Sequence, residues 1–239
     1  MTASQRFLII NADDFGRSLG INRGIVTTHE RGIVTSASLM ARWPAAADAA
    51  SYALKHPALG VGLHFDLSEW AYRGDSSRPV YVIDSDRREA VEAEARTQLA
   101  RFRSLLGRDP THIDSHHHVH REEPVRSVLV TIAAELGVPL RGANELIVYR
   151  GDFYGQTARG EPLTSAITEE ALIEIVRSLC AGTTEMGCHP GAGTDGESTY
   201  DTERVREVEA LCGSAVQTAI REEGVILCSF ASAPSGLGE

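Results

Sequence analysis

The sequence predicts an α/β protein, a (β/α) barrel of about seven parallel strands that occupies residues 1–239 as one domain. Short apolar runs alternate along the chain with segments of helical periodicity, which is the pattern of a parallel sheet with outer helices. No low-complexity linker divides the chain, and a length of 239 residues suits a single barrel. We therefore favour a barrel over an open doubly wound sheet.

The strands are predicted from short runs rich in apolar residues, each followed by polar or turn-forming residues. They are expected at Arg6–Ala12, Thr35–Met40, Leu59–Phe65, Thr111–Ser115, Val138–Arg141, Glu185–His189 and Val225–Phe230.

The helices are predicted between these runs, and the clearest is Arg87–Leu106. Its apolar residues recur on one face, Gly107 follows as a C-cap and Pro110 as a stop. The other helices are expected at Ile21–Arg31, Ala45–His56, Pro124–Leu136, Glu169–Cys180 and Glu203–Glu222. Two polar segments, Asp66–Asp86 and Glu145–Ile167, remain between these elements.

Composition excludes several classes of protein. The chain has 33 acidic and 23 basic residues, a formal net charge of −10, and no Lys/Arg run, which disfavours binding to nucleic acid or to an anionic membrane. The apolar run Phe7–Ile10 is too short for a signal peptide and no stretch is long enough to span a membrane, so we expect a cytoplasmic protein. The four cysteines form no CxxC pair, which disfavours a disulfide framework or a zinc knuckle.

Ionisable residues follow four of the predicted strands. They are Asp13 and Asp14 in NADDFG, His64 in GLHF, the run from His112 to His120, which holds five of the nine histidines, and His189 in CHPG. Each motif also has a purely structural explanation: adjacent Asp residues form turns, and a single His often only makes hydrogen bonds. The carboxyl ends of parallel strands meet at one edge, however, so we expect these side chains to share a site.

The residue types indicate a metal-dependent hydrolase. Strand alternation places His112, Asp114, His116, His118 and His120 on one face, as far as the strand persists. A carboxylate and two imidazoles form a site with open positions for water and substrate. A second, adjacent carboxylate then serves as the general base, and a histidine on another strand as the general acid. We expect the histidine run to supply one ligand and supporting partners rather than a five-histidine cage.

In these motifs the sequence resembles the YdjC-like family, which includes the ChbG and HpnK groups of carbohydrate deacetylases. The resemblance rests on NADDFG, GLHF, THIDSHHHVH and CHPG, in the expected order and spacing, and runs from Leu8 to about Phe230. It implies a distorted (β/α) barrel related to NodB-type deacetylases, which removes acetyl groups from N-acetylated sugars with one divalent cation, Mg²⁺ or Zn²⁺. A homodimer is also a family-level expectation.

The resemblance assigns roles position by position. Asp14, His64 and His116 match the metal ligands. Asp13 matches the catalytic base, His189 the general acid, and Arg141 the arginine that orients the base.

After GLHF the chain departs from the chitooligosaccharide deacetylase pattern and reads DLSEWAYRGD. We expect the chemistry to be kept and the sugar specificity to differ. Trp70, Tyr72 and Tyr154 are candidates for contact with a sugar ring. Two alternatives stay open at this point: another metal-dependent hydrolase such as a phosphoesterase, and a non-catalytic, metal-stabilised sugar-binding protein.

Overall fold

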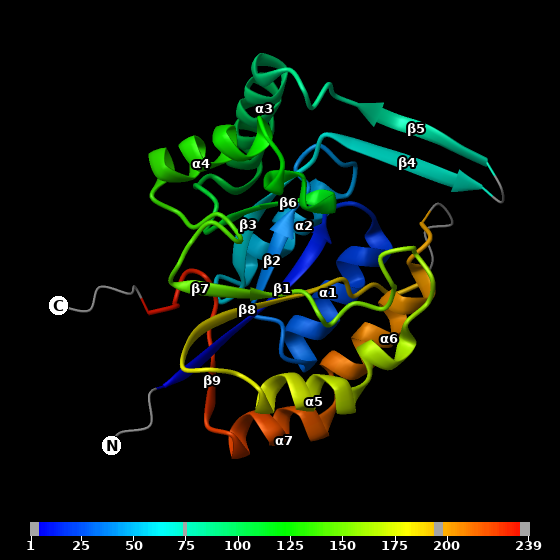
Figure 1. Ribbon diagram of the computed structural model, residues 1–239, viewed down its shortest axis with the longest axis vertical. Helices are drawn as coiled ribbons and strands as arrows, with labels where there is room; N and C mark the ends of the chain where they lie inside the picture. The colour runs from blue at the N-terminus through cyan, green and yellow to red at the C-terminus, as the bar shows by residue number, and fades with distance from the viewer. Residues whose placement is uncertain (1–4, 74–75, 194–197, 235–239) are drawn as a thin grey trace.

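The computed structural model describes residues 5–73, 76–193 and 198–234. A parallel sheet with the strand order β6-β3-β2-β1-β8-β7 forms the centre of the molecule (Figure 1). The ninth strand of the chain, β9, pairs with the start of β1. The strands of this sheet are β1 (Arg6–Phe15), β2 (Ser36–Leu39), β3 (Gly60–Phe65), β6 (Ile113–Ser115), β7 (Ile147–Arg150), β8 (Gly182–Cys188) and β9 (Val225–Leu227).

The predicted α/β architecture, a distorted barrel of about seven parallel strands, is confirmed as a half-barrel. The two ends of the strand order, β6 and β7, do not pair with each other among the described residues. Every residue of β2 and β3 is buried. Burial of whole strands is expected of a parallel sheet covered on both faces.

Helices surround the sheet, with α5 and α7 packed together at one end and α3 and α4 at the other (Figure 1). Their bounds are α1 (Leu19–Arg31), α2 (Ala46–Lys55), α3 (Arg88–Leu106), α4 (Val125–Leu136), α5 (Glu169–Arg177), α6 (Asp201–Leu211) and α7 (Ser214–Glu222). Short 3-10 helices lie at His116–Arg121 and Thr164–Ile167. The apolar face predicted for α3 is buried, and Gly107 ends that helix in the left-handed conformation with φ 66°.

Two predicted elements are wrong, and a glycine lies directly after one and inside the other. Val138–Arg141 makes only a single bridge, from Leu140 to Ile113, since the chain turns at Gly142 with φ 67°, and the next strand is β7. The helix expected over Glu203–Glu222 is divided into α6 and α7 at Gly213, whose backbone is extended. A Cβ at Gly213 would lie 2.1 Å from Oε2 of Glu169, so a larger residue there would require the Glu169 side chain to move.

The polar segment Asp66–Asp86 contains an antiparallel hairpin that the sequence analysis missed. Its strands are β4 (Ser68–Arg73) and β5 (Ser76–Val82), and it extends away from the half-barrel (Figure 1). Periodicity gave no signal for a buried face, and the large apolar residues Trp70, Val80 and Val82 of the hairpin are indeed 38%, 44% and 57% exposed. Among the described residues, no helix has the length and hydropathy needed to cross a membrane.

Helix α1 packs directly on the loop that follows β8. A Cβ at Gly24 of α1 would lie 2.3 Å from Cα of Gly191, two residues beyond His189. The absence of a side chain at Gly24 therefore sets the position of this loop.

We predict that Gly24→Ala destabilises the protein, although Ala is favoured over Gly by about 1 kcal/mol within a helix. Overpacking against the loop backbone is expected to lower the free energy of unfolding by about 1–3 kcal/mol. Urea unfolding measures the change, with Glu30→Ala on the exposed part of the same helix as the control. A Gly24→Ala variant more stable than the wild type would contradict this packing.

Candidate active site

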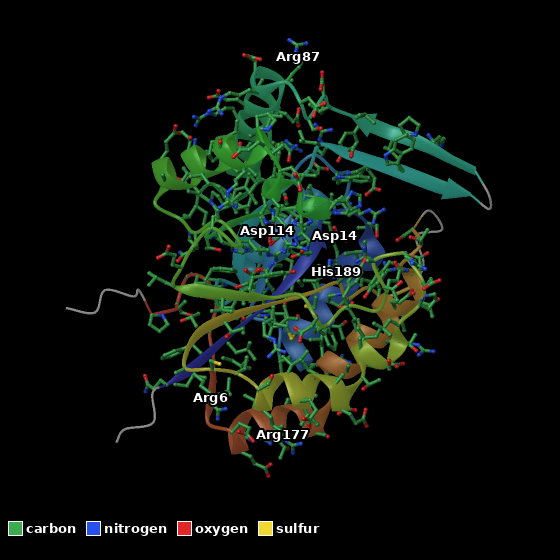
Figure 2. All side chains as sticks on the ribbon, viewed as in Figure 1. Arg6, Asp14, Arg87, Asp114, Arg177 and His189 are labelled. Atoms are coloured by element: carbon green, nitrogen blue, oxygen red, sulfur yellow. The ribbon has the colours of Figure 1, made fainter. Side chains whose placement is uncertain are left out.

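The carboxyl ends of the strands meet around a cavity of about 480 Å³. Figure 2 shows Asp14, Asp114 and His189 gathered at the centre of the molecule, whereas Arg6, at the start of β1, lies at the opposite edge of the sheet. The cavity is lined by seven of the candidate site residues predicted from the sequence: Asp13, Asp14, His64, Trp70 (38% exposed), His116, Tyr154 and His189.

The turn from β1 to α1 places two adjacent aspartates in this cavity. Asp14 has a left-handed backbone with φ 68°, a conformation that Asp tolerates better than most residues, and Gly16 follows with φ 91°. The side chain of Asn22 in α1 accepts a hydrogen bond from the Gly16 N–H at 2.7 Å. The NADDFG segment therefore forms the turn after β1 and also places two aspartates in the cavity.

Asp14, His64 and His116 form a cluster whose potential ligand atoms all lie within 4.8 Å of one another. The Oδ1 atom of Asp14 lies 3.0 Å from Nδ1 of His116 and 3.5 Å from Nε2 of His64. The three residues come from β1, β3 and the first position of the 3-10 helix that follows β6, so the half-barrel brings them together.

Each histidine of this cluster has a carboxylate behind it. Nδ1 of His64 lies 2.7 Å from Oδ1 of Asp114, and Nε2 of His116 lies 3.0 Å from Oε2 of Glu69. A carboxylate in this position fixes the tautomer and orientation of a metal-binding imidazole. Asp114 was expected only on the same strand face, and Glu69 was not predicted at all.

These residues fit a divalent cation. Oδ1 of Asp14 is buried and accepts no hydrogen bond of normal geometry from the described residues, although two imidazole nitrogens lie nearby. Buried polar oxygens are rarely left without a partner. A cation between the oxygen and the two nitrogens would satisfy all three, and one carboxylate with two imidazoles is a donor set found in zinc and other transition-metal sites.

The other aspartate, Asp13, is held by Arg141. The guanidinium donates to both carboxylate oxygens, at 2.7 and 2.8 Å, and Asn11 donates to Oδ1 at 2.9 Å. Burial opposes ionisation of Asp13, but the charge and hydrogen bonds of Arg141 bring its pKa below the ordinary value. Asp13 is therefore a fixed carboxylate beside the cluster.

Arg141 also binds Asp114 and Glu185, at 2.8 and 2.6 Å. Burial raises the pKa of Glu185 to about 7 despite the opposing effect of Arg141. Arg141, which the family resemblance matched to the arginine that orients the base, thus contacts three carboxylates.

His189 lies beside Asp13, with its Nε2 3.8 Å from Oδ2 of Asp13. Its ring makes edge contacts with Tyr154 and Tyr200, and its backbone N–H donates to Glu207 at 2.5 Å. Burial lowers the pKa of His189 to about 4, so its imidazole is neutral near pH 7 in this state.

Helix α6 contributes a buried arginine that sequence reasoning missed. Arg204 donates to Oδ2 of Asp14 at 2.5 Å and to the carbonyl oxygen of His189 at 3.1 Å. Burial opposes ionisation of Asp14, yet Arg204 holds its pKa well below the usual range. The sequence around Arg204 reads as a charged, solvated helix face, and the burial of Glu203 and Glu207 beside it carries no periodic signal.

The histidine run does not alternate as expected. The strand ends at Ser115, and His117 and His118 have φ values of 54° and 53°, so a turn replaces the strand. His116 joins the cluster, while His112 is buried against Phe230, with ring centroids 3.7 Å apart. The expected strand alternation beyond Ser115 is therefore wrong, and the role of the run as one ligand with supporting neighbours stays a prediction.

Of the candidate sugar contacts, Trp70 and Tyr154 line the cavity. Tyr154 also stacks on Tyr200, with centroids 4.7 Å apart. Tyr72 lies on β4, and its side chain is outside the described residues.

The half-barrel has the fold of carbohydrate esterases. It superposes on a family 4 carbohydrate esterase from Streptomyces lividans, solved with acetate, with a TM-score of 0.58 and 11% identity over 99% of this chain and 100% of that one. It also superposes on an Enterococcus faecalis protein with a proposed role in cellobiose-phosphate cleavage, with a TM-score of 0.78 and 28% identity over 97% and 100% of the two chains. The first likeness concerns the fold alone.

The chain belongs to the family described as YdjC-like protein, whose model matches residues 7–222. It is 36% identical to a carbohydrate deacetylase from Geobacillus stearothermophilus, over 94% of this chain and 97% of that one. It is 30% identical to a chitooligosaccharide deacetylase from Serratia marcescens, over 95% and 98% of the two chains. The family resemblance inferred from the four motifs is confirmed.

We predict that Arg204→Met lowers the free energy of unfolding by about 3 kcal/mol or more, because it leaves the buried Asp14 carboxylate without its arginine partner. Arg206→Met on the exposed face of the same helix is the control and is expected to change it by about 0.5 kcal/mol or less. Chemical denaturation at pH 7 measures both. Equal losses in the two variants would show that the Arg204–Asp14 contact does not stabilise the fold.

A second prediction concerns Glu207, whose pKa burial raises from 4.5 to about 7. Between these pH values the folded state holds a proton that the unfolded state has lost, so stability falls as the pH rises. We expect Glu207→Gln to flatten this fall, as measured by the free energy of unfolding from pH 5 to pH 8. A pH profile unchanged from the wild type would contradict the raised pKa.

Proposed function

We propose that this protein removes acetyl groups from N-acetylated sugars in a reaction that depends on one divalent cation. The observation that carries the proposal is the Asp14–His64–His116 cluster, which shares one cavity with Asp13 and His189. The names of the two curated relatives, a carbohydrate deacetylase and a chitooligosaccharide deacetylase, support the substrate class. We propose residues 1–239 as one deacetylase domain that acts as a homodimer.

In this proposal Asp14, His64 and His116 hold the cation. When bound, a divalent cation polarises the acetyl carbonyl and lowers the pKa of a nearby water. Two imidazoles favour Zn²⁺ or another transition metal, whereas Mg²⁺ prefers oxygen donors, and both ions belong in the test.

Asp13 is the proposed general base. Arg141 keeps its carboxylate ionised and fixes both oxygens, so a water at the cluster meets a base of fixed orientation. The water attacks the acetyl carbonyl carbon as Asp13 takes its proton.

His189 is the proposed general acid for the departing nitrogen. Because its imidazole is neutral near pH 7, it must first gain a proton. The 3.8 Å between Nε2 and Oδ2 of Asp13 gives a short path for the proton taken from water. The C–N bond then breaks as the imidazolium protonates the nitrogen, which yields acetate and the free amino sugar.

Trp70 and Tyr154 are the proposed contacts for the sugar. Both line the cavity that holds the cluster, and aromatic rings pack well on the apolar faces of sugars. Tyr72 keeps the same proposed role from its sequence alone.

A phosphoesterase is less well supported. A transferring phosphoryl group requires unneutralised positive charge or a second metal. The cavity arginines Arg17 and Arg204 lie 3.3 and 2.5 Å from Glu69 and Asp14, and Arg141 is bound to carboxylates. A non-catalytic sugar-binding protein would have no use for the Asp13–His189 pair.

The proposal is tested by acetate release from N-acetylglucosamine, chitobiose and longer chitooligosaccharides. The chelated protein is expected to be inactive, and Zn²⁺ or Mg²⁺ to restore activity. Phosphate release from a panel of phosphate esters without acetate release would favour the phosphoesterase, and sugar binding without either product would favour the binding protein.

We predict that Asp13→Asn lowers kcat for acetate release about 100- to 10,000-fold, because it removes the base and keeps the shape of the side chain. Calorimetric titration should show that this variant still binds one Zn²⁺ per chain. The matched variant Asp14→Asn is expected to lose cation binding first. Near-normal turnover in Asp13→Asn would assign the base to another residue.

A further inference from the structure

Glu69 lies in the segment where this chain departs from the chitooligosaccharide deacetylase pattern. It sits near the start of β4, in the hairpin that extends away from the half-barrel, yet its side chain is buried and lines the cavity. A buried carboxylate on an extended hairpin requires partners. Its partners identify its role.

The carboxylate of Glu69 has fixed contacts on both oxygens. Oε1 accepts a hydrogen bond from the backbone N–H of Trp70 at 2.9 Å. Oε2 lies 3.3 Å from the guanidinium of Arg17 and 3.0 Å from Nε2 of His116. The backbone and Arg17 therefore hold the carboxylate in place before any ligand binds.

We propose that Glu69 is a positioning residue that orients His116 toward the cation site, an inference that rests on the proposed function. When Nε2 of His116 donates its proton to Glu69, the lone pair of the imidazole is on Nδ1, the atom 3.0 Å from Asp14. Asp114 has the same relation to His64, through the opposite ring nitrogen. Both imidazoles are thereby directed at Oδ1 of Asp14 by a carboxylate behind them.

A second cation on Glu69, His116 and His117 is the competing assignment, since ligand atoms of these residues also lie within 4.8 Å of one another. Two contacts disfavour it. The guanidinium of Arg17 already lies beside Oε2 and would repel a cation there. The rings of His116 and His117 lie face against face, tilted by 32° with centroids 3.9 Å apart, so they do not point edge-on at one ion.

The test compares the wild type, Glu69→Gln and Glu69→Ala, with Asp84→Asn as the control. Asp84 is exposed just beyond the same hairpin, so its variant removes a carboxylate without touching the cavity. Chelator-treated protein is titrated with Zn²⁺ by calorimetry, and acetate release is measured at a fixed, subsaturating Zn²⁺ concentration.

We expect one Zn²⁺ per chain in all four proteins. Affinity should fall about 10- to 100-fold in Glu69→Ala, which is the usual effect of removing a carboxylate behind a metal-binding imidazole. Glu69→Gln should lie between Glu69→Ala and the wild type, because its amide oxygen can accept the same hydrogen bond. Asp84→Asn should match the wild type. If Glu69→Ala does not fold, the Zn²⁺ affinity of Glu69→Gln is compared with that of the wild type instead.

Three results would overturn the inference. Equal Zn²⁺ affinity in Glu69→Ala, Glu69→Gln and the wild type would show that Glu69 has no influence on the site, while the proposed function stands. Two Zn²⁺ per wild-type chain, with one lost in Glu69→Ala, would make Glu69 a ligand of a second cation. A wild type that binds no Zn²⁺ and no Mg²⁺ would overturn the proposed function and this inference together.

Discussion

The buried guanidinium of Arg141 is the interaction on which the rest of the site depends. It joins Asp13 on β1, Asp114 on β6 and Glu185 on β8, three strands that are not all neighbours in the sheet. Without it these carboxylates would repel one another within the half-barrel, at distances where water does not screen them. Arg141 therefore sets the position of Asp13 and, through Asp114, the orientation of His64.

A single guanidinium does not balance three carboxylates, and Asp14 and Glu69 add two more at the same end of the sheet. The molecule distributes this charge in three ways. Arg204 and Arg17 each bind one of the added carboxylates, Glu185 has a pKa of about 7, and the imidazoles of His64 and His116 face Asp14. Of these carboxylate oxygens, Oδ1 of Asp14 has no hydrogen-bond partner among the described residues, and a divalent cation would satisfy it.

The candidate site was readable in the sequence because its residues follow strand ends, where turn motifs and ionisable side chains coincide. NADDFG, GLHF and CHPG each contain a candidate site residue directly after an apolar run. The residues that support them were not readable. Arg204 and Glu207 lie in a helix whose charged residues resemble a solvated face, and Glu69 lies in a segment read as a polar loop. Their roles depend on burial, which local periodicity does not encode.

By itself, then, the sequence determined the α/β class and most of the strand and helix positions. It also predicted that ionisable side chains would meet at one edge, since parallel strands end there whatever their order, and the family resemblance selected Asp14, His64 and His116 among them. Only the tertiary structure decided that the barrel stays open between β6 and β7, that Val138–Arg141 makes one bridge instead of a strand, and which nitrogen of each histidine faces Asp14. These features follow from contacts between segments far apart in the chain. In those contacts, the role of each guanidinium or carboxylate depends on the charged group that the fold packs against it.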